Sequence, residues 1–135
     1  MPISPTYSKM IIIPESTIDE NGHVNNVTYV QWMQDIAVEH YASIGGVEAQ
    51  GPDATWVVRE HRIEYLLPAF AGEKIEIKTW VENIRRVRSL RKYEFVRKSD
   101  GKVLVRGETD WVFINVKTSA PQAIPQRVMD VFKPL

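Results

Sequence analysis

Residues capable of acid–base chemistry cluster in one short polar segment, Asp19-Glu20-Asn21-Gly22-His23-Val24-Asn25-Asn26. The Asp19 carboxylate can take a proton from an attacking water, or can attack a carbonyl carbon itself and form a mixed anhydride. Asn21 can orient the water or a substrate, and His23 can bond Asp19 or protonate a leaving group. The segment is therefore a candidate catalytic site, and Asp19 is its leading residue.

The same segment also has a purely structural interpretation. Asp, Asn and Gly favour tight turns, and Asn25 or Asn26 can cap a helix, for local hydrogen-bonding reasons alone. Both interpretations predict a loop from residue 15 to residue 26.

A long helix is predicted to follow this loop. Apolar residues recur at a period near 3.6 from residue 27 onward, namely Val27, Tyr29, Val30, Trp32, Met33, Ile36, Ala37, Tyr41 and Ile44. Gly45 and Gly46 can adopt the left-handed conformation that caps the C-terminus of a helix. The predicted helix then has about 19 residues and a length of about 28 Å. Free backbone N–H groups around Asn26 and Val27 then carry partial positive charge and can hold an oxygen that becomes negative in a reaction.

Short apolar or alternating runs predict five strands, over residues 7–13, 55–66, 74–84, 89–97 and 102–116. Pro14 closes the first run, and Ser99-Asp100-Gly101 is a hairpin signal between the last two. Neighbouring strands are expected to pair as meanders, and a short helix is expected to start at Pro125. One strand, a loop, a long helix and four further strands predict an α+β fold, with one antiparallel sheet of about five strands wrapped around a long central helix.

The order of elements and the polar segment resemble the hotdog-fold thioesterases of the 4-hydroxybenzoyl-CoA and YbgC-like type. In that family a carboxylate ten residues ahead of a helix tyrosine is catalytic, and Asp19 stands in that relation to Tyr29. Asp19, Asn21 and His23 also resemble the Asp-x-Asn-x-His spacing of plant acyl-ACP thioesterases. Those enzymes carry a further Glu on the next strand, where this chain has Tyr65-Leu66-Leu67-Pro68-Ala69.

The resemblance implies that residues 1–135 form one hotdog domain and hydrolyse an acyl-CoA thioester to a free carboxylate and CoA. The catalytic set would be Asp19, Asn21, His23 and Asn26, with the oxyanion held at the start of the helix and with no metal and no cofactor. The alternatives are an acyl-ACP thioesterase, or a non-catalytic module that binds acyl thioesters. A hydratase of the same fold would need a His-Asp arrangement that the segment does not resemble.

A basic cluster, made of Arg85, Arg86, Arg88, Arg91 and Lys92, surrounds Ser89 near a predicted strand junction. Arginine forks suit the phosphates of CoA, so Tyr29, Arg86, Arg88, Ser89 and Arg91 are predicted to bind substrate. The other interpretation is a solvated hairpin end, and strand alternation divides the cluster between two faces. An acyl pocket would be lined by Tyr29, Trp32, Met33, Trp56 and Val58, and the alternative that these are simply core residues is favoured for most of them.

Composition excludes several classes of function. Lys+Arg and Asp+Glu both total 17, so no global field attracts nucleic acid or an anionic membrane. The chain has no cysteine, which excludes disulfides and a thiolate nucleophile. No apolar stretch is long enough to span a membrane and no signal peptide is evident, so a cytoplasmic protein is expected. By the resemblance it is a homodimer or homotetramer with sites at the subunit boundary.

Overall fold

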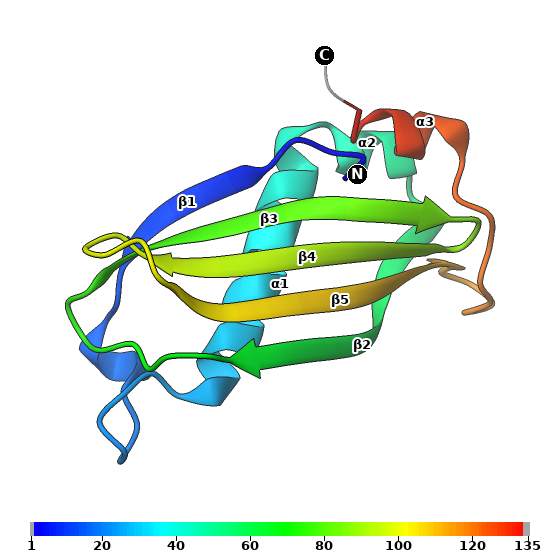
Figure 1. The fold of residues 1–135 in the computed structure, drawn as a ribbon. Helices are drawn as coiled ribbons and strands as arrows, with labels where there is room; N and C mark the ends of the chain where they lie inside the picture. Colours follow the sequence, from blue (N-terminus) through cyan, green and yellow to red (C-terminus); the bar gives the residue numbers. More distant parts are fainter. Residues whose placement is uncertain (1, 134–135) are drawn as a thin grey trace.

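The computed structural model describes residues 2–133 and contains one sheet, one long helix and short helices at the ends of loops (Figure 1). The five strands are β1 (Tyr7–Ile12), β2 (Ala54–Tyr65), β3 (Lys74–Arg85), β4 (Arg88–Arg97) and β5 (Val103–Asn115). The helices are α1 (Asn26–Ser43), α2 (Gly46–Gln50) and α3 (Gln126–Asp130), and a 3₁₀ turn, η1, covers Glu15–Thr17. The predicted α+β class is therefore confirmed.

The sheet is antiparallel throughout and has the strand order β1-β3-β4-β5-β2. Strands β3, β4 and β5 form the predicted meander. The expected pairing of β2 with β3 is wrong, because β2 crosses to the far edge and pairs with β5. Loop 66–73 makes this crossing, and Figure 1 shows it at the end of the sheet where α1 begins.

The core lies between α1 and the concave face of the sheet. Strand β3 alternates as predicted, with Ile75, Ile77 and Val81 buried toward the helix. On α1 the buried residues are Tyr29, Met33, Ile36, Ala37 and His40. The predicted apolar stripe was therefore wrong at its start, since Val27 is 74% exposed.

Turn and cap residues set the ends of α1 as the sequence predicts. Asn25 is the N-cap, and its side-chain oxygen accepts a hydrogen bond from the Val27 N–H at 2.9 Å. Gly45 is left-handed with a φ of 82°, but Gly46 already belongs to α2, which the sequence analysis missed. Pro125 precedes α3 as its N-cap instead of occupying its first turn.

The centre of α1 crosses β5 at a glycine. A Cβ atom on Gly107 would lie 2.8 Å from the sulfur and 3.1 Å from the methyl carbon of Met33, which is fully buried. The absence of a side chain at Gly107 lets the helix approach the sheet closely at this point.

We expect Gly107→Val to lower the free energy of unfolding by about 1–3 kcal/mol, because the added methyl groups overpack the site of Met33. Urea unfolding measures this loss. Combining Gly107→Val with Met33→Ala should cost less than the sum of the two single changes, because the second change makes room for the first. Additive losses would show that the two residues do not compete for the same space.

Candidate functional site

Asp19 lies in a closed loop immediately before α1. Its backbone N–H donates to the His23 carbonyl at 3.0 Å, and its own carbonyl accepts the Gly22 N–H at 3.0 Å. Its Oδ1 accepts the Asn21 N–H at 2.8 Å, which closes an Asx turn. A β-bridge between Ile18 and Val24 seals the base of the loop. The turn predicted by the structural interpretation is thus present, and it holds the carboxylate of the half-buried Asp19 on the Asn21 N–H.

The start of α1 offers a single free amide. The Val27 N–H is taken by the side chain of Asn25, and the Thr28 N–H donates to the Asn25 carbonyl at 3.0 Å. The Val27 amide is therefore not the oxyanion donor that the sequence analysis expected. The Asn26 N–H has no acceptor among residues 2–133 and keeps the positive end of the helix dipole available.

A cavity of about 270 Å³ opens beside this amide. Its lining consists of His23, Val24, Asn26, Tyr29, Tyr65 and the segment 66–69. Three predicted site residues, His23, Asn26 and Tyr29, therefore share one cavity. Asp19 and Asn21 are not among the lining residues: Asp19 is joined to His23 by a backbone hydrogen bond, and Asn21 is exposed on the loop.

Tyr29 forms the buried wall of this cavity. Its ring packs edge-on against Phe95 at 5.1 Å and Trp32 at 5.6 Å between centroids, and the residue is 3% exposed. Burial, followed by the neighbouring Tyr65 and Glu73, raises the pKa of Tyr29 to about 12. Its hydroxyl therefore stays protonated at neutral pH and is a hydrogen-bond donor.

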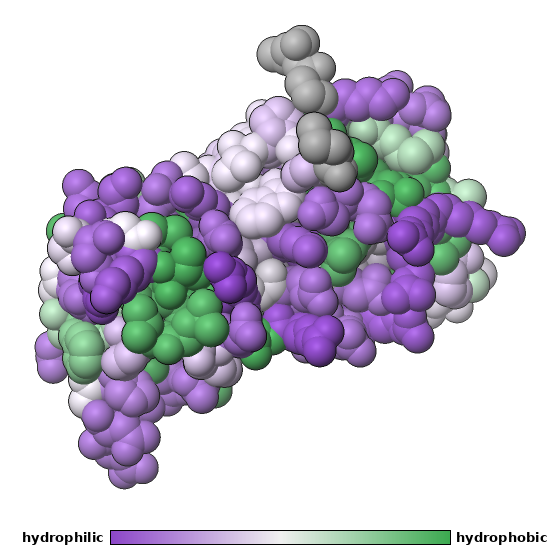
Figure 2. Space-filling view, viewed as in Figure 1, coloured by the Kyte–Doolittle hydropathy of each residue, from purple (hydrophilic) through white to green (hydrophobic). Residues whose placement is uncertain are grey.

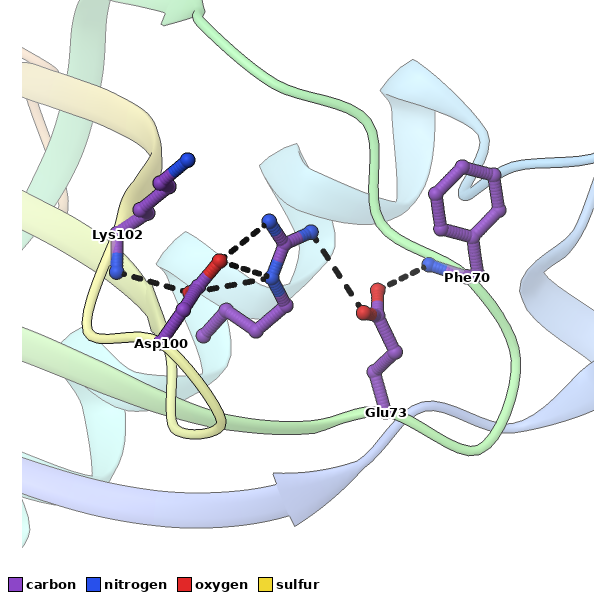
Figure 3. A network of polar contacts seen from close by, with 5 residues as sticks. Phe70, Glu73, Asp100 and Lys102 are labelled. Carbon is purple, nitrogen blue, oxygen red and sulfur yellow. Dashed lines mark hydrogen bonds and ion pairs between the residues drawn. The ribbon is translucent and has the colours of Figure 1, made fainter.

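Loop 66–73 closes the opposite wall and is held by the polar network in Figure 3. Glu73 accepts the Phe70 N–H at 2.7 Å and pairs with Arg97 at 3.6 Å. Arg97 also bonds Asp100 at 2.8 Å, which ties the loop to the β4–β5 hairpin. The Ala69 carbonyl in turn accepts the Val24 N–H at 2.9 Å, so the loop holds the base of the Asp19 loop in place.

Exposed apolar side chains border the same cavity. Tyr65, Leu66, Leu67 and Phe70 are each between 37% and 45% exposed. Figure 2 shows a hydrophobic area at the end of the molecule where Figure 1 places loop 66–73. An exposed apolar patch beside a cavity is typical of a binding surface.

The structure separates the predicted arginines from Asp19. Arg86 and Arg88 lie at the β3–β4 turn, and loop 66–73 lies at the other end of β3, about 36 Å away for a strand of this length (Figure 1). Arg88 is also paired with Asp110, with its Nε donating at 3.2 Å. In one chain these two residues do not share a site with Asp19.

Ser89 and Arg91 point inward and line a second cavity of about 240 Å³. Tyr41 of α1, Trp56 of β2, Trp111 of β5 and Phe132 also line it. Arg91 Nη1 donates to His40 Nδ1 at 2.8 Å and to the Thr79 hydroxyl at 3.1 Å. The expected acyl pocket is thus divided, with Tyr29 in the first cavity and Trp56 in the second.

Two absences hold for residues 2–133. No cluster of three His, Cys, Asp or Glu side chains is arranged to bind a metal ion. No helix in this part of the chain is long and apolar enough to cross a membrane.

The sequence analysis missed the segment that forms most of the first cavity wall, residues 65–69. A signal was present, because Leu66, Leu67 and Phe70 place large apolar side chains in a proline-glycine loop. Such residues in a solvent-facing loop indicate a surface that something covers. The contact of this loop with Val24 is long-range and has no local signature.

A family model for the "Thioesterase-like superfamily" matches residues 14–132, and the chain belongs to this superfamily. The match includes the Asp19 loop, both cavities and all but the first strand of the sheet. The resemblance to hotdog thioesterases stated from the sequence is confirmed, and the sheet wrapped on α1 is the hotdog fold.

Individual proteins agree with this assignment. The chain is 24% identical over 136 residues to oleoyl-acyl carrier protein thioesterase 1 of Arabidopsis thaliana; the match covers 94% of this chain but only 37% of the plant protein. The structure of a 1,4-dihydroxy-2-naphthoyl-CoA thioesterase from Synechocystis superposes with a TM-score of 0.83, at 17% identity and with 95% and 96% of the two chains covered. A DHNA-CoA thioesterase from Staphylococcus aureus gives a TM-score of 0.79 at 25% identity, covering 93% and 85%.

His40 makes stability depend on pH. Burial, followed by the positive charge of Arg91, lowers the pKa of His40 from 6.5 to about 4. Between these values the unfolded chain binds a proton at His40 and the folded protein does not, so the free energy of unfolding falls as the pH drops from about 6.5 to about 4. The limit of this slope is about 1.4 kcal/mol per pH unit.

Urea unfolding of wild type and His40→Gln at several pH values between 7 and 4 checks this expectation. The glutamine can still accept from Arg91 but does not titrate, so the variant should lose less stability than wild type over the window. Parallel losses in the two proteins would show that His40 does not contribute.

Proposed function

We propose that this chain hydrolyses an acyl-CoA thioester, with Asp19 as the catalytic carboxylate. In the overall reaction one water is consumed, the carbon–sulfur bond breaks, and the products are a carboxylate and free CoA. The observation that carries the proposal is the first cavity, which is lined by Asn26 with its free backbone amide and by His23 of the loop that holds the Asp19 carboxylate in a fixed turn. Membership of the thioesterase-like superfamily supports the reaction class.

The cavity contains donors suited to a developing negative charge. The Asn26 N–H carries the helix dipole, and the Tyr29 hydroxyl stays protonated, so both can donate to the thioester oxygen. His23 lines the same space and can deliver a proton to the departing sulfur. Asn21 lies on the rim, where its exposed side chain can contact water or the substrate.

Asp19 has two chemically distinct routes. As a general base it removes a proton from water, and as a nucleophile it forms a mixed anhydride that water then hydrolyses. A single turnover in H₂¹⁸O separates them, because direct attack by water puts ¹⁸O into the released acid. The nucleophilic route instead leaves ¹⁸O in the Asp19 side chain when water attacks the aspartyl carbonyl.

The carrier is proposed to be CoA, with acyl carrier protein as the second candidate. Both solved structures above are named as CoA thioesterases, whereas the plant relative is named as an oleoyl-acyl carrier protein thioesterase. The chain spans only 37% of the length of the plant relative. The Asp-x-Asn-x-His spacing of this chain therefore resembles one part of that enzyme, and the rest of the enzyme has no counterpart in the match. Comparing kcat/KM for one acyl group on both carriers decides between them.

A second copy of the chain is proposed to complete the site. Among the described residues β2 is an edge strand of 12 residues that pairs with β5 alone, and Val57 and Tyr65 on it are exposed. Long unpaired sheet edges are normally protected or covered, and symmetric pairing of two copies is a common way to cover them. Arg86 and Arg88 are far from Asp19 in one chain, so their proposed contact with the CoA phosphates requires the partner's site.

Sedimentation equilibrium is expected to show a dimer or a tetramer, and Val57→Lys is expected to raise its dissociation constant by about tenfold or more. In a symmetric dimer the lysine introduced in one copy lies near the lysine introduced in the other, across the two-fold axis, and the repulsion of these two buried charges weakens the interface. Arg62→Lys, on the same strand but conservative in charge, is the matched control. A wild-type monomer at high micromolar concentration would contradict the proposed assembly.

Asp19→Asn is expected to lower kcat for an acyl-CoA by about a hundredfold or more, the range for loss of a catalytic base. Free-thiol release from short, long and aromatic acyl-CoAs measures this. The asparagine keeps an oxygen that accepts the Asn21 N–H, so the turn and the thermal unfolding midpoint should be unchanged.

Glu20→Gln is the matched control, because it removes an exposed neighbouring carboxylate and should leave kcat within about twofold. Full activity in Asp19→Asn would show that Asp19 is a turn residue only. Inactivity of wild type on every CoA and carrier-protein thioester would favour the binding module instead.

A further inference from the structure

The second cavity contains a buried positive charge with no negative partner. Arg91 is 4% exposed, and among residues 2–133 no carboxylate lies within salt-bridge distance of it. Its two hydrogen-bond partners, His40 Nδ1 and the Thr79 hydroxyl, are both neutral and both meet Nη1. Burying an unpaired guanidinium is costly, so its retention in the core calls for a function.

Other groups around the cavity are donors as well. The indole N–H groups of Trp56 and Trp111 and the Tyr41 hydroxyl are buried without a hydrogen-bond partner of normal geometry. Trp56 lies near Tyr41 and Trp111 near Tyr93, so each indole N–H can donate to the neighbouring tyrosine hydroxyl, which would still leave the Tyr41 O–H unused. The acceptors that line this space, Gln50, Thr55 and Ser89, are all neutral, so the lining offers no negative charge to Arg91.

Apart from Gln50, Thr55 and Ser89, the rest of the lining is apolar. Ala37, Val38, Val47 and Phe132 face the cavity, and Val38 is 62% exposed, which marks the entrance from solvent. From Asn26 to Ala37 the helix rises about 16 Å, so this cavity is distinct from the one beside Asp19 in the same chain. An apolar channel leading to a cluster of donors fits a molecule with an apolar body and an acceptor-only end.

We propose that the second cavity is a binding site for the carboxylate group of an apolar carboxylic acid, with Arg91 as its charge partner. A carboxylate has acceptors only and matches the guanidinium fork, which keeps Nε and Nη2 for it. The carboxylate has two possible sources: a free acid, or the distal end of a dicarboxylic acyl group on a thioester. The inference depends on the donors of this cavity and not on thioester hydrolysis.

Binding without turnover tests the site directly, with decanoate as the probe and decanol as the uncharged control. Titration calorimetry should show decanoate binding about tenfold or more tightly than decanol, and Arg91→Met should remove this difference, as expected for loss of a charge-assisted bond. Arg91→Lys should restore part of it, and Arg62→Met, which changes an exposed arginine, should not alter it.

The four tryptophans give an independent location for the ligand. In ¹H–¹⁵N spectra decanoate should shift the indole signals of Trp56 and Trp111, and should leave those of Trp32 and Trp80 in place. Val38→Trp narrows the entrance without touching Arg91, so it should weaken both ligands. Val38→Trp therefore still tests binding in this cavity if Arg91→Met fails to fold.

The two sources are separated by kinetics. If the distal carboxylate of an acyl group is bound, wild type should prefer adipoyl-CoA over hexanoyl-CoA, and Arg91→Met should abolish the preference. If free acids are the ligands, decanoate binds but that preference is absent. Equal binding of decanoate and decanol with no adipoyl preference, or indole shifts confined to Trp32 and Trp80, would overturn the proposal, even in an active thioesterase.

Discussion

Close packing of α1 against the sheet is the constraint on which both cavities depend. Met33 fits over Gly107, and Tyr29, Ile36 and Ala37 extend this contact along the buried face of the helix. The helix is thereby fixed along its whole length. Its first turn holds the Asn26 amide beside the Asp19 loop, and its last turns bring His40 and Tyr41 against Arg91 and Trp56.

The two ends of α1 differ in their electrostatics. At the beginning, the helix dipole and a protonated Tyr29 favour a charge that develops during a reaction. Toward the end, a permanent positive charge is buried beside a neutral histidine, and its desolvation lowers the pKa of Arg91 to about 10. A charge that develops only during a reaction and a permanent charge favour different ligands, so we propose a thioester for the first cavity and a carboxylate for the second.

The sequence predicted the elements well because their signals are local. Asn25, Gly45, the alternation of Ile75 and Ile77 and the Asp100-Gly101 turn each act over a few residues. The Asp19 loop was also found from its residue types, and so was its turn. The role of Asp19 in chemistry remains a prediction, since the geometry agrees with both a turn and a catalytic site.

What the sequence did not predict depends on contacts between distant segments. The crossover of β2 to β5, and the closure of the first cavity by loop 66–73, bring together residues between 40 and 61 positions apart. Arg91 was grouped with Arg86 and Arg88 because they are close in sequence. Strand alternation turns Arg91 into the core, and only the packed structure shows that it has no acidic partner there.

The catalytic role of the first cavity is tested most directly by a crystal structure of the protein with a non-hydrolysable acyl-CoA in which a methylene carbon separates the carbonyl from sulfur. We expect the ketone oxygen at hydrogen-bond distance from the Asn26 N–H, with the carbonyl carbon facing the Asp19 carboxylate. A ketone bound anywhere else, or an Asp19 carboxylate turned away from it, would contradict the assignment of the first cavity as the catalytic site.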